Sequence, residues 1–248
     1  MNSISNDKSW KYSNFLENKY FKFDRDQIFS VLSKNEIDSA YKVISNWENY
    51  SSTPLENLNK LSFELGLKKI FYKDESKRFN LKSFKALGGA YAVEIMSQNK
   101  KNITVSTATA GNHGRSVAWG AKRLGLNCKI FISEFVSESR AEAMRRFGAE
   151  VFRVKGNYDN SLKECIKQSN INGWEIIQDV AWEKYELVPK LTMAGYAVMM
   201  KEISDPINKN EISHIFLQAG SWVVWPQQWI AGCARYLEYV PKNNYCGN

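Results

Sequence analysis

Short runs of β-branched and aromatic residues alternate along this chain with longer segments of helical spacing. The short runs predict strands over 69–72, 103–105, 128–132, 150–154 and 174–178. The longer segments predict helices over 37–47, 55–66, 117–124, 139–147 and 160–169, and one that begins at Lys85. Ser139 and Glu142 have the spacing of a capping box at the start of one helix. Strands separated by helices predict an α/β protein with parallel sheets and right-handed crossovers.

Composition sets bounds on this picture. With 248 residues, 44% of them hydrophobic, the chain can bury one good core or two small ones. It has no apolar run that could span a bilayer, and its polar N-terminus lacks the core of a signal peptide, so we expect a cytoplasmic protein without a membrane partner. The net charge is +8, but the lysines are scattered and no nucleic-acid-binding motif is present. A solvated basic surface explains the charge better than a nucleic-acid partner.

The four cysteines give no sign of a metal site. Cys128, Cys165, Cys233 and Cys246 lack the spacing of metal ligands and a secretory context. We therefore expect free thiols in a reducing compartment, and no metal.

One lysine, Lys85, stands where a loop gives way to a helix. Good helix formers follow it over 86–93. A lysine held at such a junction can be aimed into a cleft, as an enzyme requires if it binds an aldehyde cofactor as a Schiff base. Taken alone, the position is more typical of a solvated surface lysine.

A second candidate site is the turn Gly111-Asn112-His113-Gly114, which joins the strand near Thr104 to the following helix. Glycines let backbone approach a ligand closely, and a helix N-terminus favours an anion. An ordinary loop without a ligand is the competing interpretation, and for His113 a role in turn structure alone is the better one.

The two motifs together resemble the pyridoxal-phosphate enzymes of the tryptophan-synthase-β type (fold type II), and within that group the diaminopropionate ammonia-lyases. The resemblance rests on 73–92, on 111–119 and on Gln178-Asp179-Val180-Ala181-Trp182-Glu183, with Pro189 and 193–196 beyond it. It extends from about Tyr41 to Gly220. Threonine dehydratases share the lysine and the Gly-Asn-His-Gly turn, but not the Asp-x-Ala-Trp-Glu stretch.

The resemblance implies a fold of two open parallel-sheet domains. Residues 76–172 would form a small domain inserted into a larger cofactor-binding domain built from 1–75 and 173–248. It also implies a pyridoxal 5′-phosphate cofactor, a small amino-acid substrate and a homodimer. The implied reaction is α,β-elimination from 2,3-diaminopropionate to pyruvate and ammonia, and threonine or serine dehydration is the alternative.

The resemblance also implies roles for single residues. Lys85 would hold the cofactor as a Schiff base, and Asp179 would remove the α-proton of the L-substrate. Asn112 would hydrogen-bond the cofactor's 3-oxygen, and Gly111, Gly114 and Gly220 would contact the cofactor. A competing interpretation of Asp179 is a helix N-cap, since 180–183 can begin a helix, although one residue could serve both purposes.

Two departures from the family pattern affect these expectations. Ala110 replaces the Asp that usually precedes the Gly-Asn-His-Gly turn and that is thought to serve the D-isomer, so D-substrate activity is in question. After Gly220, a glycine-rich phosphate loop is expected, but 221–229 contains three tryptophans and a proline.

Codon phase offers an explanation for the second departure. Codons for 221–229 read two bases out of phase permit Val (or Leu)-Gly-Gly-Leu-Ala-Ala-Ala-Met, and those for 242–248 read one base out of phase permit a buried strand. We therefore expect that frameshifts have altered the loop, and that about the last third of the enzyme is missing, including the partner of the cofactor's ring nitrogen. A truncated, catalytically inactive remnant is thus an alternative to an active enzyme.

Overall fold

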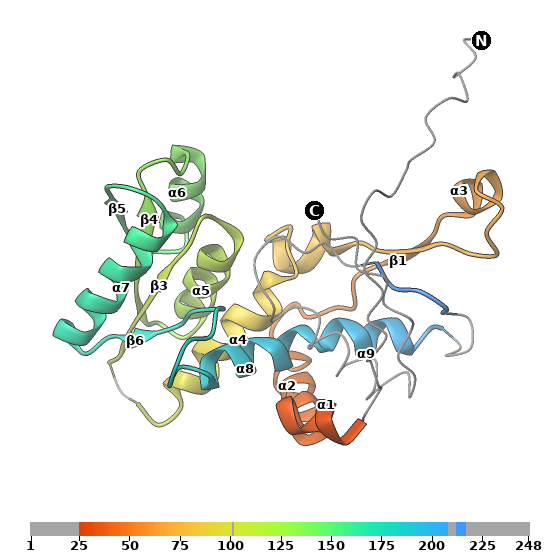
Figure 1. Cartoon of the computed structure of the whole chain (residues 1–248), viewed down its shortest axis with the longest axis horizontal. Coiled ribbons are helices and arrows are strands. Elements are labelled where there is room, and N and C mark those ends of the chain that lie inside the picture. The colour runs from red at the N-terminus through yellow and green to blue at the C-terminus, as the bar shows by residue number, and fades with distance from the viewer. Residues whose placement is uncertain (1–24, 101, 208–211, 217–248) are drawn as a thin grey trace, which may run out of the picture.

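The computed structural model describes residues 25–100, 102–207 and 212–216. At one end of the molecule is a four-stranded sheet of order β5-β4-β3-β6, in which all neighbouring strands are parallel (Figure 1). Its strands are β3 (Thr104–Ala108), β4 (Asn127–Ser133), β5 (Glu150–Val154) and β6 (Glu175–Ile176). The helices α5 (Asn112–Arg123), α6 (Glu138–Arg145) and α7 (Tyr158–Asn172) pack around it. The predicted α/β architecture is confirmed.

The other end of the described chain is mainly helical (Figure 1). Its helices are α1 (Arg25–Val31), α2 (Lys34–Ile44), α8 (Leu187–Tyr196) and α9 (Val198–Ser204). A capping box between Ser33 and Glu36 begins α2. One apolar core unites buried side chains of α2 with those of α8 and α9, among them Ile37, Ile44 and Met199.

Helix α4 (Lys85–Ser97) joins the two ends, because it contributes to both cores. Leu87, Ala90 and Tyr91 belong to the helical core, whereas Ala92 and Val93 pack with the sheet. Such a helix is apolar around its circumference, as expected of a buried helix. Its N-terminal residue is the candidate lysine, which therefore has a rigid base.

The segment over 55–66 is not the single helix that its pattern predicts. It begins with strand β1 (Leu55–Asn57), which pairs antiparallel with β2 (Phe71–Lys73), and only α3 (Asn59–Glu64) between them is helical. The pairing continues beyond the strands, where the Leu58 amide donates to the Ile70 carbonyl at 2.8 Å. Tertiary pairing has here overridden local helical preference. The predicted strand over 69–72 thus lies outside the parallel sheet.

The boundaries of the other helices differ less from the predicted ones. Helix α5 begins at Asn112, five residues before the predicted start. Ser137 rather than Ser139 is the N-cap of α6, and it has no side-chain capping bond, so the predicted capping box is wrong. Glu142 instead forms ion pairs with arginines at the end of the helix. Helix α7 begins at Tyr158 because Asn157 and Asn160 form a reciprocal cap.

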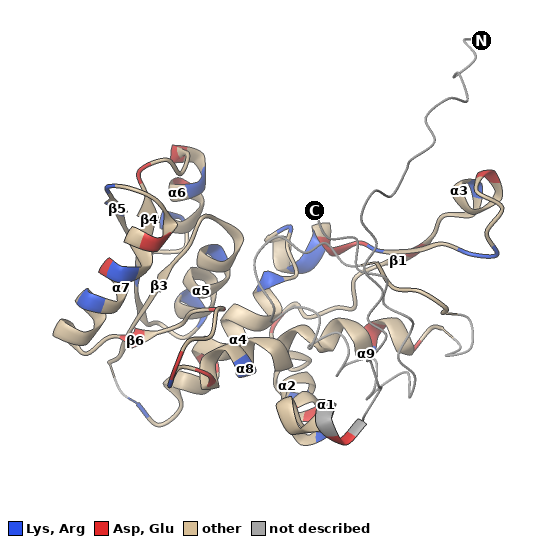
Figure 2. Ribbon diagram, in the orientation of Figure 1, with Lys and Arg blue, Asp and Glu red and all other residues tan. Residues whose placement is uncertain are grey.

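Charged side chains of both signs occur on α6 and α7, so these helices carry no stripe of one sign (Figure 2).

Cys128 and Cys165 are buried free thiols, as predicted. Burial raises the pKa of Cys128 to about 12 and that of Cys165 to about 11. Over the described part of the chain, no helix is long and apolar enough to cross a membrane. The predicted domain boundaries remain a prediction.

Candidate active site

The structure brings the two candidate catalytic residues into direct contact. Lys85 Nζ lies 2.7 Å from Asp179 Oδ2, and each side chain is 16% exposed. Lys85 is the first residue of α4, and Asp179 follows β6 after two residues, so 94 positions of sequence separate them. The pair therefore lies where the carboxyl end of the parallel sheet meets the helix that joins the two cores. This edge of a parallel sheet is where α/β proteins bind ligands.

Gln178 fixes the backbone that carries Asp179. Its side-chain Oε1 accepts from Thr107 Oγ1 at 2.9 Å and from the Ala108 amide at 3.1 Å. Its Nε2 donates to the Ala108 carbonyl at 3.0 Å and to the Tyr158 hydroxyl at 2.6 Å. The side chain is fully buried, and a satisfied buried amide specifies geometry because each lost partner is costly. Gln178 thus locks the segment before Asp179 to the end of β3.

Tyr185 holds the same segment from the other side. The Gln178 amide donates to the Tyr185 hydroxyl at 2.8 Å, and this hydroxyl donates to the Ile176 carbonyl at 2.7 Å. The ring stacks on Trp182 at a centroid distance of 3.8 Å. Residues 180–186 are not helical, and α8 begins only at Leu187. The alternative interpretation of Asp179 as a helix N-cap is therefore wrong.

The electrostatic surroundings keep Asp179 ionised. Burial alone would raise its pKa, yet the positive charges of His113, when protonated, and of Lys85 hold the pKa below its ordinary value of 3.8. The negative charge acts in turn on nearby phenols. Burial, and then Asp179, raise the pKa of Tyr158 to about 12 and move that of Tyr196 well above its ordinary value. Asp179 is thus a carboxylate at neutral pH.

His113 lies behind the pair and is 5% exposed. Its Nδ1 is 3.5 Å from Asp179 Oδ2, and its Nε2 is 2.9 Å from the Ile177 carbonyl oxygen. Burial lowers the pKa of His113, the adjacent Asp179 opposes this effect, and Lys85 reinforces it. His113 therefore lies in direct contact with Asp179 of the candidate pair, in addition to its place in the turn.

The loop before Lys85 is anchored by a buried ion-pair network. The Arg78 guanidinium, 1% exposed, bonds Glu202 on α9 through two nitrogens, Nη1 at 2.8 Å and Nη2 at 2.7 Å. Its Nε and Nη2 also bond Glu75, at 2.8 and 2.7 Å. Lys73 Nζ adds a second ion pair to Glu202 at 2.7 Å. These bonds join the 3₁₀ segment η1 (Glu75–Asn80), ahead of Lys85, to a helix far along the chain.

Backbone strain is concentrated in this same loop. Phe79, Asn80 and Lys82 have φ values of 47°, 58° and 52°, in the left-handed region that side chains rarely adopt. The Phe79 ring packs against Trp47 and Trp119, with centroid distances of 5.7 and 4.7 Å. Ion pairs on one side and aromatic packing on the other thus hold a strained turn in place.

Close helix packing fixes the backbone of Lys85. Ser116 on α5 donates its hydroxyl to the Lys85 carbonyl at 2.7 Å. A Cβ on Gly89 would come within 2.4 Å of that Ser116 oxygen, and one on Gly195 within 2.3 Å of the Leu87 carbonyl oxygen. The glycines of α4 and α8 are therefore required for the approach of these helices, not for flexibility.

The residues of the glycine turn lie at the N-terminus of α5. Asn112 is exposed and Gly111 is half-buried, and a Cβ on Gly111 would touch the Arg140 side chain at 3.9 Å. Gly114 is buried, and a Cβ there would meet Thr109 Cγ2 at 2.3 Å. The Gly114 amide already donates to Thr109 Oγ1 at 3.2 Å. Asn112 is thus open to a ligand, whereas the Gly111 amide donates to Thr109 Oγ1 at 3.0 Å and Gly114 has a packing function.

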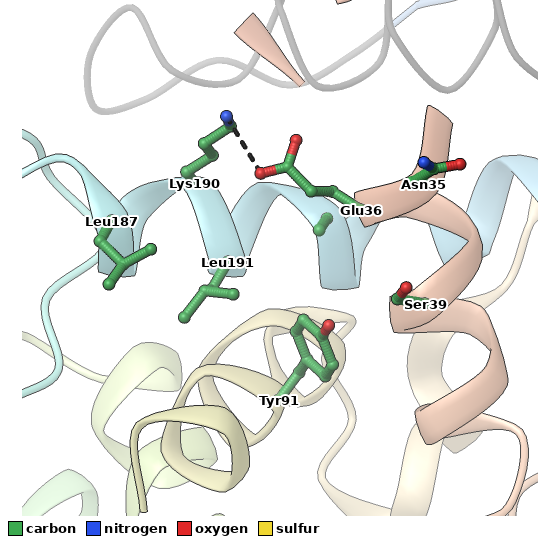
Figure 3. A pocket seen from close by; sticks show the side chains of 8 residues that line it. Asn35, Glu36, Ser39, Tyr91, Leu187, Lys190 and Leu191 are labelled. Atoms are coloured by element: carbon green, nitrogen blue, oxygen red, sulfur yellow. Dashed lines mark ion pairs between the residues drawn. The ribbon is translucent and has the colours of Figure 1, made fainter. Parts of the chain in front are cut away.

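A pocket of about 180 Å³ lies elsewhere, between α2, α4 and α8 (Figure 3). Its lining includes Tyr91, Leu191 and an ion pair of Lys190 Nζ with Glu36 Oε1 at 3.0 Å. Neither Lys85 nor Asp179 lines it. Its charged groups are paired with each other, so it offers no reactive group.

The arrangement around Lys85 fits the aldehyde end of pyridoxal phosphate. A Schiff base requires a primary amine that is anchored yet reachable from solvent, and Lys85 Nζ meets both conditions. Asn112 adds an exposed residue at the N-terminus of α5. The predicted contact at Gly220 and the altered stretch over 221–229 lie outside the described residues.

Comparison with known proteins agrees with this chemistry. A family model described as "Pyridoxal-phosphate dependent enzyme" matches residues 47–240. The chain belongs to this family. Its cofactor is pyridoxal phosphate, as the sequence predicts, and the fold-type-II architecture is confirmed.

Individual relatives refine the comparison. The chain is 36% identical over 249 residues to the diaminopropionate ammonia-lyase of Escherichia coli K12. This match covers 92% of this chain and 61% of the relative. It is 39% identical over 198 residues to that of Salmonella typhimurium, covering 69% and 49%. The crystal structure of the Escherichia coli enzyme in complex with D-serine has a TM-score of 0.83 at 32% identity, covering 90% of this chain and 61% of that chain. An L-threonine dehydratase from Pasteurella multocida is 39% identical over only 116 residues. The chain thus spans about three fifths of the length of the ammonia-lyases that it matches.

Sequence reasoning missed several residues that build the site. Gln178 stands within the quoted motif beside Asp179, but its role depends on the end of β3. Glu202 offered only one weak signal, an acid in a short helix that also contains apolar residues and Lys201. Ser116 offered none, because its hydroxyl bonds a carbonyl rather than another side chain.

Proposed function

We propose that this chain carries the lysine-bearing part of a pyridoxal-phosphate-dependent ammonia-lyase acting on 2,3-diaminopropionate, with pyruvate and ammonia as products. The observation that carries the proposal is the contact of Lys85 Nζ with Asp179 Oδ2 at 2.7 Å, at the carboxyl edge of the sheet. The similarity to diaminopropionate ammonia-lyases over 92% of the chain supports the substrate. A homodimer and a cytoplasmic location are further proposals.

Each residue has a defined task in this proposal. When bound, pyridoxal phosphate supplies an electron sink for the carbanion at the substrate's α-carbon. Lys85 supplies the amine that holds the cofactor's aldehyde carbon, and α4 keeps that amine in place. Asp179 accepts the α-proton as a carboxylate. While the Lys85 ammonium is paired with it, Asp179 is a weak base; removal of that charge makes it a stronger one.

Ala110 bears on the stereochemistry. It lies exposed just before Gly111, where its methyl group has no proton to give or take. We therefore propose that the L-isomer is the substrate, since Asp179 is the acid–base group that touches Lys85.

The direct test compares substrates on the purified chain supplied with pyridoxal phosphate. We expect 2-oxo-acid release from L-2,3-diaminopropionate to exceed that from L-threonine and L-serine. Faster release from threonine or serine would favour a dehydratase, which the Pasteurella relative makes the second candidate. Cofactor bound at Lys85 without turnover of any of the three would indicate an inactive remnant.

A further inference from the structure

His113 has only one ring nitrogen that can exchange a proton at the site. The Ile177 carbonyl oxygen, 2.9 Å from Nε2, can only accept, so Nε2 must carry the hydrogen. Neutral His113 is therefore the Nε2–H tautomer, and its Nδ1 is a bare acceptor. That Nδ1 is buried, makes no hydrogen bond with any described residue, and lies 3.5 Å from Asp179 Oδ2.

This arrangement places two acceptors beside each other and one cation opposite them. Asp179 Oδ2 receives the Lys85 ammonium at 2.7 Å on one side and faces the bare nitrogen of His113 on the other. A buried lone pair beside a carboxylate is unfavourable unless a proton lies between them. The positive charge of Lys85 discourages that proton while the ion pair exists.

We propose that His113 is a positioning residue that takes up a proton on Nδ1 when the Lys85 ammonium leaves Asp179, and so keeps this carboxylate ionised and oriented. Its catalytic meaning rests on the proposed function, in which the Lys85 amine must give up its ion pair to hold the cofactor. The proton comes from solvent and returns to it when the Lys85 ammonium is restored. No covalent bond forms or breaks.

The groups that control this protonation can be named. Asp179 raises and Lys85 lowers the pKa of His113, in addition to the effect of burial. The phenols of Tyr158 on α7 and Tyr196 on α8 lie within the electrostatic reach of Asp179, and burial together with that charge keeps them neutral at physiological pH. Among the described residues around the pair, His113 is thus the group suited to change its charge.

The test is NMR of the full chain labelled with ¹⁵N and ¹³C, without cofactor. The chain has two histidines, His113 and the exposed His214, so His214→Gln assigns the signals. We expect the Nε2–H tautomer for His113 near neutral pH. We also expect Lys85→Met to raise its pKa by about one unit or more and Asp179→Asn to lower it, since these variants remove a like and an opposite charge.

Several results would overturn the proposal, and one of them needs no variant of the site. An Nδ1–H tautomer in the unmodified chain would contradict it, as would a His113 pKa that neither Lys85→Met nor Asp179→Asn changes. Amide spectra of each variant show whether it is folded, and the tautomer remains decisive if a variant is not. Because no cofactor is present, failure here leaves the proposed function untouched, while failure of cofactor trapping at Lys85 leaves the titration intact.

Discussion

Arg78 and Glu202 meet in two hydrogen bonds, Nη1 to Oε1 at 2.8 Å and Nη2 to Oε2 at 2.7 Å, although 124 residues separate them. Both side chains are almost fully buried, at 1% and 2% exposed. The bond joins the strained loop before Lys85 to α9, and thus connects the position of the Lys85 amine to the helical core.

Removing one partner of the Arg78–Glu202 pair should lower the stability of the fold. We expect Arg78→Met to lower the free energy of unfolding by about 3–5 kcal/mol, because it leaves the Glu202 carboxylate buried with fewer partners. Chemical denaturation measures the change. The matched control is Lys190→Met, which breaks the half-exposed ion pair with Glu36 shown in Figure 3 and should cost about 1 kcal/mol or less. Equal losses in the two variants would show that the Arg78 pair does not anchor the loop.

The same pair should make the free energy of unfolding depend on pH in the acid range. Burial would raise the pKa of Glu202, but Arg78 and Lys73 outweigh burial and hold it below its ordinary value of 4.5. The unfolded chain therefore binds this proton more readily, so the stabilisation is present above about pH 4.5 and is lost as pH falls through the lower pKa of the folded state. The free energy of unfolding of Glu202→Gln should change less steeply with pH below 4.5 than that of the unmodified chain. Identical slopes would contradict the assignment.

Gln178 should matter for stability as well as for the site. Gln178→Met keeps a similar volume but leaves the Ala108 amide and carbonyl and the Thr107 hydroxyl without their partner. We expect a loss of about 2 kcal/mol or more. Gln168→Met, on α7, removes only hydrogen bonds within its own helix and should cost less than 1 kcal/mol. A loss at Gln178 no greater than at Gln168 would show that the amide is not a lock.

The contact between α4 and α8 leads to a steric prediction. A Cβ at Gly195 would lie 2.3 Å from the Leu87 carbonyl oxygen and 2.8 Å from Gly88 Cα. Since backbone cannot move aside cheaply, Gly195→Ala should destabilise by about 3 kcal/mol, at the upper end of overpacking costs. Gly173→Ala meets no atom within 4 Å and suffers only from its φ of +66°, at a cost of about 1 kcal/mol. Thermal unfolding should show a larger loss of stability for Gly195→Ala than for Gly173→Ala, and the reverse order would contradict the steric explanation.

Features that depend on residues close together in the sequence were predicted correctly. The helix at Lys85 and the strand–helix alternation follow from residues near each other along the chain, and both are confirmed. The prediction for 55–66 was wrong because its first residues pair with β2, 14 to 18 positions further along the chain, and this pairing outweighed helical preference. The Arg78–Glu202 pair was not predicted because a buried ion pair leaves no periodic trace.

For the candidate site, too, some residues could be predicted from the sequence and others could not. Lys85 could be singled out by its position at a helix start, but only family resemblance selected Asp179, because no spacing argument brings residues 94 positions apart together. The contacts of His113 could not be predicted, because only the folded chain brings the Ile177 carbonyl and the Asp179 carboxylate to its ring.

The central claim is that Lys85 is the amine that holds pyridoxal phosphate. The most direct measurement incubates the purified chain with the cofactor, reduces it with borohydride and locates the pyridoxyl group by peptide mass spectrometry. We predict modification of the peptide that carries Lys85, its loss in Lys85→Ala, and its retention in Lys77→Ala, which removes an exposed lysine of the same loop. Modification of a different lysine, or none at saturating cofactor, would contradict the account.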